Sequence, residues 1–266
     1  MIIIMEIKAM YFSPTKTTEK TILRIGENLS NKLNYSFVKI NITPFKSRNK
    51  NYSFNKEDIL ILGLPVYGGR IPEILEEFIS NLNGNGTLAV VVAVYGNRDY
   101  DDALLEMKNL LNDKGFNVIA AAAFIGEHSF SDKLAAGRPD KSDMDFIKVI
   151  ADKIMSKIML IKDNADLKDF KVKGSFPYKE RGKLPLVSIK TTDGCSICMD
   201  CIEACPNNDI DEKSPEKTDP SKCIVCCSCV KFCRENAKYI DDEMILNLKT
   251  MLENNFMERR EPELFI

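Results

Sequence analysis

Residues 195–206 read CSICMDCIEACP and residues 223–233 read CIVCCSCVKFC, and these two stretches decide how the last third of the chain folds. Each contains four cysteines in the spacing C-x2-C-x2-C-x3-C. Of the nine cysteines in the chain, only Cys227 lies outside this pattern. Three thiolates two residues apart can bind one iron-sulfur cubane, and the fourth, three residues further on, points toward a neighbouring cluster. The pattern therefore predicts two 4Fe-4S clusters.

The spacing also predicts that each cluster takes ligands from both stretches. The first set is Cys195, Cys198, Cys201 and Cys233, and the second set is Cys223, Cys226, Cys229 and Cys205. The arrangement resembles the two-cluster bacterial ferredoxins over residues 188–240. It departs from them in two details, because Arg234 replaces the proline after the fourth cysteine and Cys227 is additional. We expect Cys227 to be a small packing residue.

Disulfides and zinc are the alternatives to iron. Disulfides need an oxidising compartment, and the sequence contains no export signal. Zinc sites usually combine two C-x2-C pairs, or cysteine with histidine, separated by about a dozen residues or more. Three closely spaced cysteines followed by a fourth, in two copies, fit iron better than either alternative.

Length predicts the number of domains, and charge limits the kinds of partner. The chain has 266 residues, 44% of them hydrophobic, and a formal net charge of −2. This size favours two domains, and the balanced charge argues against a nucleic-acid partner. The apolar opening is interrupted by Glu6 and Lys8 before it reaches the length of a signal peptide or a membrane span, so we expect a cytoplasmic protein without a membrane partner. The predicted organisation is a sheet domain at 1–162, a linker at 163–186, a cluster domain at 187–240, and a docking helix with its tail at 241–266. The tail ends in apolar residues, so we expect it to be buried against the protein, and a partner-binding tail is the alternative.

The first 162 residues alternate between strand-like apolar runs and segments of helical period. This alternation is typical of a parallel sheet covered on both faces. The predicted strands are 2–12, 35–40, 58–64, 87–94 and 117–124, and the predicted helices are 17–33, 73–82, 101–113 and 142–161. Five strands with interleaved helices predict a flavodoxin-like, doubly wound five-stranded parallel sheet in the α/β class, followed by a small α+β two-cluster domain. In such sheets the ligand lies outside the carboxyl ends of the strands.

The loop after the first predicted strand is rich in hydroxyls and leads directly into a helix. A helix N-terminus offers unpaired amides and partial positive charge, which suit a phosphate group. The loop resembles the flavodoxin phosphate loop, and this resemblance implies that Ser13, Thr15, Thr17 and Thr18 bind the phosphate of FMN. Lys16 stands where that loop usually has glycine, and its ammonium group is expected to help neutralise the phosphate. The alternative is that these residues only cap the helix.

Two further loops at strand ends combine glycine with an aromatic residue. Paired glycines let the backbone approach a ligand closely, and a neighbouring aromatic ring can lie flat on a ring system. Tyr67 is therefore predicted to cover one face of the flavin and Tyr100 the other, although a half-buried tyrosine at a strand end is the simpler alternative. Arg98 is predicted to contact the ring. The predicted cofactor residues in these loops are Pro65, Val66, Tyr67, Gly68, Gly69, Tyr95, Gly96, Asn97, Arg98 and Tyr100.

The fourth strand-end loop contains His128, the single histidine of the chain. Its place in the sheet allows it, or the adjacent Glu127, to donate a proton to a substrate at the flavin. An ordinary loop histidine without a catalytic role is the alternative. No G-x-G-x-x-G motif follows a strand, which favours electrons that arrive through a redox protein over electrons from a bound dinucleotide.

The chain as a whole resembles the flavodoxin-ferredoxin fusion proteins of anaerobes. The resemblance implies electron transfer through FMN and two 4Fe-4S clusters, with a ferredoxin-type donor or acceptor protein as partner. A reductase with a small unsaturated, nitro or quinone-like substrate at the flavin is the second hypothesis, and a cluster-based sensor is the third. The sequence leaves open whether the protein is an enzyme and whether it forms a homodimer.

Overall fold

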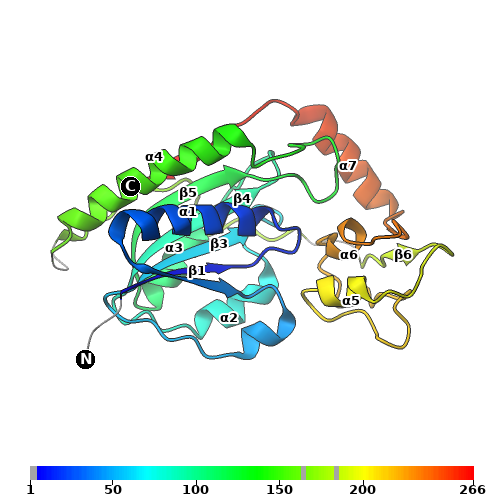
Figure 1. Ribbon diagram of the computed structural model, residues 1–266. Coiled ribbons are helices and arrows are strands. Elements are labelled where there is room, and N and C mark those ends of the chain that lie inside the picture. Colours follow the sequence, from blue (N-terminus) through cyan, green and yellow to red (C-terminus); the bar gives the residue numbers. More distant parts are fainter. Residues whose placement is uncertain (1–4, 163–165, 183–185) are drawn as a thin grey trace.

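The computed structural model describes residues 5–162, 166–182 and 186–266 (Figure 1). Two parts lie side by side. The α/β part comprises residues 5–162 together with a strand at the C-terminus, and the cysteine-rich part comprises residues 186–240. Among the described residues, no helix is long and apolar enough to cross a membrane.

The sheet of the α/β part has the predicted parallel order with one additional strand. Its strands follow one another as β2-β1-β3-β4-β5, and all of these neighbours are parallel. The prediction of five strands was incomplete, because β8 (Glu263–Phe265) pairs antiparallel with β5 as a sixth strand. The tail thus packs against the protein, as predicted. The parallel strands are β1 (Glu6–Tyr11), β2 (Ser36–Asn41), β3 (Ile59–Pro65), β4 (Leu88–Tyr95) and β5 (Asn117–Ile125).

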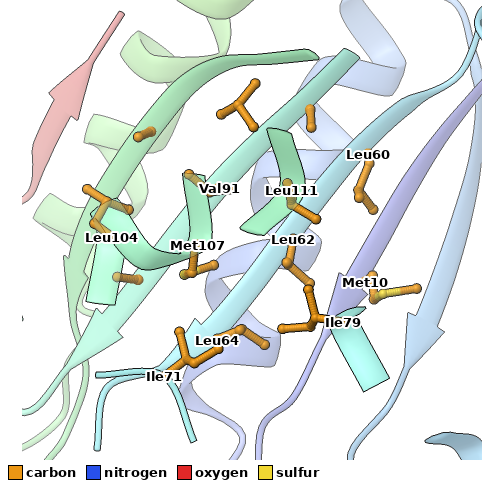
Figure 2. Close-up of a cluster of buried hydrophobic side chains, with 14 of the residues drawn as sticks. Met10, Leu60, Leu62, Leu64, Ile71, Ile79, Val91, Leu104, Met107 and Leu111 are labelled. Atoms are coloured by element: carbon orange, nitrogen blue, oxygen red, sulfur yellow. The ribbon is translucent and has the colours of Figure 1, made fainter. Parts of the chain in front are cut away.

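Helices cover both faces of this sheet. Side chains alternate along a strand, so Leu60 and Leu62 of β3 lie in the core under α2 and α3, whereas Ile59 and Ile61 lie in the core under α1 and α4 (Figure 2). The predicted helix at 17–33 is confirmed at both ends. The helical segments of this part are α1 (Thr17–Leu33), η1 (Phe45–Asn49), η2 (Glu73–Leu75), α2 (Glu76–Ser80), α3 (Ala103–Asp113) and α4 (Lys141–Leu160).

A buried ion pair anchors the start of α4. Both nitrogens of the Arg138 fork lie 2.5 Å from the Asp143 carboxylate, and the two side chains are 5% and 0% exposed. Asp143 also accepts a hydrogen bond from the backbone of Asp140, whose side chain caps the helix in return. Arg138 donates a further bond to the carbonyl of Arg260, just before β8. One buried charge therefore connects the helix start to the C-terminal segment.

The cysteine-rich part has little regular structure and a small core. Val187, Ile189, Ile210 and Val225 pack there with cysteines of both runs and with Ile245 of α7 (Glu243–Asn255). After α7 the chain returns to the sheet as β8. The remaining elements of this part are β6 (Lys190–Thr191), which pairs with β7 (Lys238–Tyr239), and the short helices α5 (Asp200–Ala204) and α6 (Ser228–Lys231).

The described part of the predicted linker packs on α3. The side chain of Asp102, beside the start of that helix, accepts hydrogen bonds from the backbone of Ser175 at 2.8 Å and of Lys179 at 2.7 Å. Arg181 reaches the carboxylate of Glu106 on the same helix. Residues 163–165 and 183–185 of the predicted linker lie outside the described residues. The chain thus leaves the α/β part along its surface.

Candidate cofactor sites where the two parts meet

The structure brings the eight predicted cluster ligands together in two groups of four. Each group lines a cavity and contains cysteines of both stretches. The first ring is formed by Cys195, Cys198, Cys201 and Cys233, and the second ring by Cys205, Cys223, Cys226 and Cys229. These are the sets that the spacing predicts. Ligation of iron by them stays a prediction, and the grouping is what supports it.

The two runs fold alike, residue for residue, with an offset of 28 positions. Ile197 and Met199 in the first run and Val225 and Cys227 in the second all have left-handed backbone, with φ between 51° and 67°. In both copies a short helix begins after the second of these residues. The sulfur of the fourth cysteine accepts a backbone N–H from the fourth residue beyond it, at 3.5 Å in one copy and 3.2 Å in the other. Hydrogen bonds of this kind to ligand sulfurs tune cluster potentials.

Each ring has a cation beside its thiols. Lys238 lines the first ring, is 4% exposed and donates to the carbonyl of Pro215 at 2.5 Å. Arg48 lies next to the second ring, where it donates to the carbonyl of Pro206 at 2.6 Å. Burial raises the pKa of Cys205 to about 11 and the pKa of Cys223 to about 12. Because such thiols ionise only beside a compensating positive charge, four of them around a cavity with a neighbouring cation fit a metal cluster.

The cysteines of the two rings are the candidate metal ligands of the cysteine-rich part. Within the described residues, no three His, Cys, Asp or Glu side chains converge on a point that a single metal ion would occupy. The four cysteines of a cubane bind four different irons, so they stand further apart than the ligands of one ion. Four thiols line the first cavity and five line the second, where Cys227 is additional, so each cavity has the four thiols that a 4Fe-4S cluster takes.

The three predicted flavin loops lie at one edge of the sheet. They follow β1, β3 and β4, whose carboxyl ends are in register, with Tyr11 opposite Gly63 and Pro65 opposite Val94. The N–H of Val66 donates to the carbonyl of Val94 at 2.9 Å, which fixes the start of the second loop against β4. The sheet therefore gathers the three loops where its order predicts a ligand.

In the first loop, the backbone is shaped for a turn into α1. Lys16 has φ 65°, the left-handed conformation that glycine adopts most easily, so the chain keeps the loop shape despite the lysine. The hydroxyl of Ser13 accepts the N–H of Glu19 at 2.9 Å. The capping alternative thus holds for Ser13. Thr18 is 1% exposed with its methyl group toward Gly63, so its side chain faces the sheet, whereas Thr15 and Thr17 are partly exposed.

The second loop holds Tyr67 at the corner of a tight turn. Tyr67 and Arg70 exchange two backbone hydrogen bonds, at 2.9 and 3.1 Å, around Gly68 and Gly69, which both have positive φ. A side chain at Gly68 would meet no atom within 4 Å, so there is open space beside the turn. Arg70 is held in turn by Glu106, at 2.8 and 2.7 Å. The two backbone hydrogen bonds and the ion pair of Arg70 therefore fix the shape of the turn that carries Tyr67.

In the third loop, Asn97 is the residue suited to a ligand. Its side chain is 2% exposed and donates to the carbonyls of Phe256 and Glu258, which fixes the orientation of the amide. Its carbonyl oxygen Oδ1 is buried without a hydrogen-bond partner. A buried acceptor without a donor is costly, and a ring N–H of a flavin would satisfy it. Together with the open space at Gly68, this orphaned oxygen fits FMN.

The structure contradicts the predicted role of Tyr100 in this loop. Tyr100 is 1% exposed and packs edge-on against Tyr95 at 5.4 Å under the ammonium group of Lys173, so it cannot cover a face of the flavin. Arg98 is 31% exposed and pairs with Asp101, and its contact with the ring stays a prediction. The sequence identifies aromatic and cationic residues near a strand end, but it does not show toward which side they turn.

The second ring lies directly against the predicted flavin loops. The hydroxyl of Ser228, between Cys227 and Cys229, donates to the carbonyl of Pro14 at 2.7 Å. The ammonium group of Lys16 lies 5.0 Å from the ring centre of Phe232, and Lys231 pairs with Glu127. Burial and nearby charges on Cys226, Cys227 and Cys223 raise the pKa of Tyr67 well above its ordinary value. Phosphate loop, Tyr67 and second ring are therefore immediate neighbours.

Ser228 and Arg48 are contact residues that the sequence analysis missed. Arg48 connects the two parts, because its guanidinium donates to the carbonyls of Ile42 and Thr43 on one side and of Pro206 on the other. Arg48 belongs to no motif, and Ser228 is marked in the sequence only by its position inside the second cysteine run.

His128 is placed unfavourably for the predicted proton donation. Burial lowers its pKa to about 4, and its Nδ1 accepts the N–H of Phe130 at 3.1 Å, so the imidazole is neutral near pH 7. The ring packs on Gly96, where an added Cβ would lie 2.3 Å from it. These contacts give His128 a packing role in place of the predicted acid.

This burial predicts a pH dependence of stability. Between the unfolded pKa of about 6.5 and the folded pKa, the unfolded chain binds a proton that the folded chain does not, so stability falls as the pH is lowered through this window. From pH 7 to pH 5 we expect wild type to lose about 2 kcal/mol more than His128→Gln. Urea denaturation of both chains at the two pH values measures the difference. Equal losses in both would show that the imidazole is accessible to protons in the folded chain.

Comparisons with solved structures find similarity to flavodoxins. A flavodoxin from the domain Archaea matches with 15% identity over 58% of this chain and 99% of its own, at a TM-score of 0.41. A flavodoxin of Streptococcus pneumoniae TIGR4 matches with 18% identity over 57% and 99%, at 0.41, and a Fusobacterium nucleatum flavodoxin bound to flavin mononucleotide with 15% over 57% and 98%, at 0.39. The strand order 2-1-3-4-5 decides the class. The α/β part is flavodoxin-like. No family model and no curated protein matches the chain.

Proposed function

We propose that this protein transfers single electrons between two 4Fe-4S clusters and an FMN, to or from a redox partner protein. The first ring and the second ring each hold one cluster, and FMN binds at the carboxyl ends of β1, β3 and β4. Cubanes exchange one electron at a time and a flavin one or two, so such a chain can join single-electron and paired-electron chemistry.

The observation that carries this proposal is the bond between the hydroxyl of Ser228 and the carbonyl of Pro14. It joins the loop of the second ring to the phosphate loop without an intervening layer of protein. Tyr67, beside the open space at Gly68, lies next to cysteines of the same ring. Cofactors bound at these two places would be neighbours, which is the condition for electron transfer between them.

The chain's own residues contribute binding, orientation and charge. Partly exposed Thr15 and Thr17 and the amides at the start of α1 bind the phosphate, and Lys16 adds a positive charge. Tyr67 covers one face of the flavin, and Oδ1 of Asn97 accepts a ring N–H. Arg48 and Lys238 offset the negative charge of the two thiolate sets. Neither Tyr100 nor His128 is placed to supply a proton to a small substrate, so a relay is favoured over a reductase.

Cofactor analysis of protein purified without oxygen tests the proposal. We expect about eight irons, about eight sulfides and one FMN per chain, with the absorption of both cofactor types in one spectrum. Potentiometric titration should then show two one-electron cluster transitions besides that of the flavin. Eight irons without FMN would mean that the chain is an iron-sulfur protein whose sheet binds no flavin. One or two zinc ions in place of iron would overturn the assignment of the rings.

A further inference from the structure

The internal repeat gives every residue of the second run a counterpart 28 positions earlier. In the second run, Ser228 and Lys231 contact the α/β part, and the adjacent Cys227 is 5% exposed. Val225 is 3% exposed because it packs in the core of the cysteine-rich part. The counterparts of Val225 and Cys227, Ile197 and Met199, are 60% and 38% exposed. Backbone conformation is the same at all four positions. The first run therefore presents, uncovered, the surface that the second run uses for docking.

The surfaces of the two runs differ in charge, and this difference indicates the charge of a partner that would cover the surface of the first run. Lys231 of the second run pairs with Glu127 of the α/β part. The counterpart of Lys231 is Glu203, which is exposed. Residues 193–203 and 233–235 carry four carboxylates and one guanidinium, whereas residues 221–231 carry two lysines and no carboxylate. The free surface thus has the opposite charge to its covered counterpart, and it requires a basic partner.

Exposed Ile197 and Met199 also surround the thiols of the first ring, whose cavity they line. Single hydrophobic residues on a surface are ordinary, but these two lie in the same run as exposed Glu203, the counterpart of Lys231, which docks in the other copy. The first run meets the α/β part at its other end, where Arg48 donates to the carbonyl of Pro206 at 2.6 Å. In Figure 1, α6 of the second run lies toward the sheet, and β6 lies on the outer side of the cysteine-rich part.

We propose that the surface formed by Ile197, Met199 and Glu203 is the port through which a basic one-electron carrier protein exchanges electrons with the first ring. This inference rests on the proposed function. One electron passes from the reduced cluster of the first ring to the oxidised carrier, or in the reverse direction, and no proton or bond is exchanged. An electron that arrives from the carrier would continue through the second ring to the flavin, and an electron that leaves to the carrier would come by the opposite route. The chain is thus a relay whose inner docking surface is permanent and whose outer one is transient.

Charge reversal at the port tests this inference. The probe is an oxidised c-type cytochrome with a basic face, which the dithionite-reduced chain reduces after removal of excess dithionite. With wild type, the second-order rate constant should fall as salt is added. Glu203→Lys should lower it at least fivefold at low salt and flatten its salt dependence. Glu77→Lys, the same change at an exposed position on α2, is the matched control and should leave the rate constant unchanged.

The apolar contact is tested separately, with a readout that needs no electron transfer. Ile197→Asn suits the left-handed backbone and removes the apolar contact, so calorimetry should show at least fivefold weaker binding of the oxidised cytochrome to the oxidised chain. Met159→Asn, at a residue 70% exposed on α4, is its control and should bind normally. If Glu203→Lys and Glu77→Lys behave alike, or Ile197→Asn binds normally, the port is elsewhere. Iron and flavin are measured on the same samples, and a chain lacking them would contradict the proposed function itself.

Discussion

Replacing Cys226 by serine should remove one of the two clusters, so that bound iron falls from about eight to about four per chain. Cys226 is buried in the second ring, and a serine hydroxyl cannot replace the thiolate as a ligand of comparable strength. The spectrum should keep the signal of the first ring, since no residue of that ring is changed. Iron and sulfide analysis of protein purified without oxygen gives the result directly.

Cys227 provides the matched control, because it is the adjacent cysteine, is equally buried and lines the same cavity. Cys227→Ser should keep about eight irons, since its counterpart in the repeat is Met199, which cannot be a thiolate ligand. If Cys226→Ser also keeps eight irons, the double variant decides whether Cys227 has taken its place. Loss of iron from Cys227→Ser alone would mean that the second ring is assigned wrongly.

Replacing Asp143 by alanine should destabilise the α/β part by about 3–5 kcal/mol, because it leaves the buried guanidinium of Arg138 without its partner. Both members of this pair are almost completely buried, and Asp143 also accepts a backbone bond at the start of α4. The loss should appear as a lower midpoint of urea denaturation with an unchanged slope.

Asp145 on the same helix is the control for this substitution. It is 54% exposed and pairs with Lys148 on the surface, so Asp145→Ala should cost less than about 1 kcal/mol. A comparable loss in both variants would mean that Asp143 acts mainly through helix capping or charge. The free energy of unfolding would then not depend on burial of the Arg138 pair.

Regular elements of the sheet could be predicted because their patterns are local. Residues 17–33 have an apolar residue on one face at every turn, and α1 has the predicted bounds. The short strand β8 could not be predicted in this way, because three residues become a strand only through their partner, here β5. The prediction identified the tail as packed and missed its pairing.

The candidate sites were predictable to the extent that spacing determines them. The spacing of the eight cysteines predicts which four belong to each ring, and the structure places the same two sets of four around the two cavities. Tyr67 and Tyr100 look alike in sequence but are placed differently in the structure. Contacts with Tyr95 and Lys173 hold the ring of Tyr100 in the core. Contacts between distant segments, such as Ser228 with Pro14, leave no trace in the local sequence.

The return of the chain to the sheet as β8 means that the cysteine-rich part is an insertion and not an appendage. A shortened chain that ended before this part would lack its last strand and would leave the main-chain groups of β5 open along one margin of the sheet. Such an uncovered margin is a template for pairing between molecules. The flavodoxin-like body therefore depends on a strand that lies beyond the cysteine-rich part, and during synthesis the sheet is completed only after every cysteine has left the ribosome.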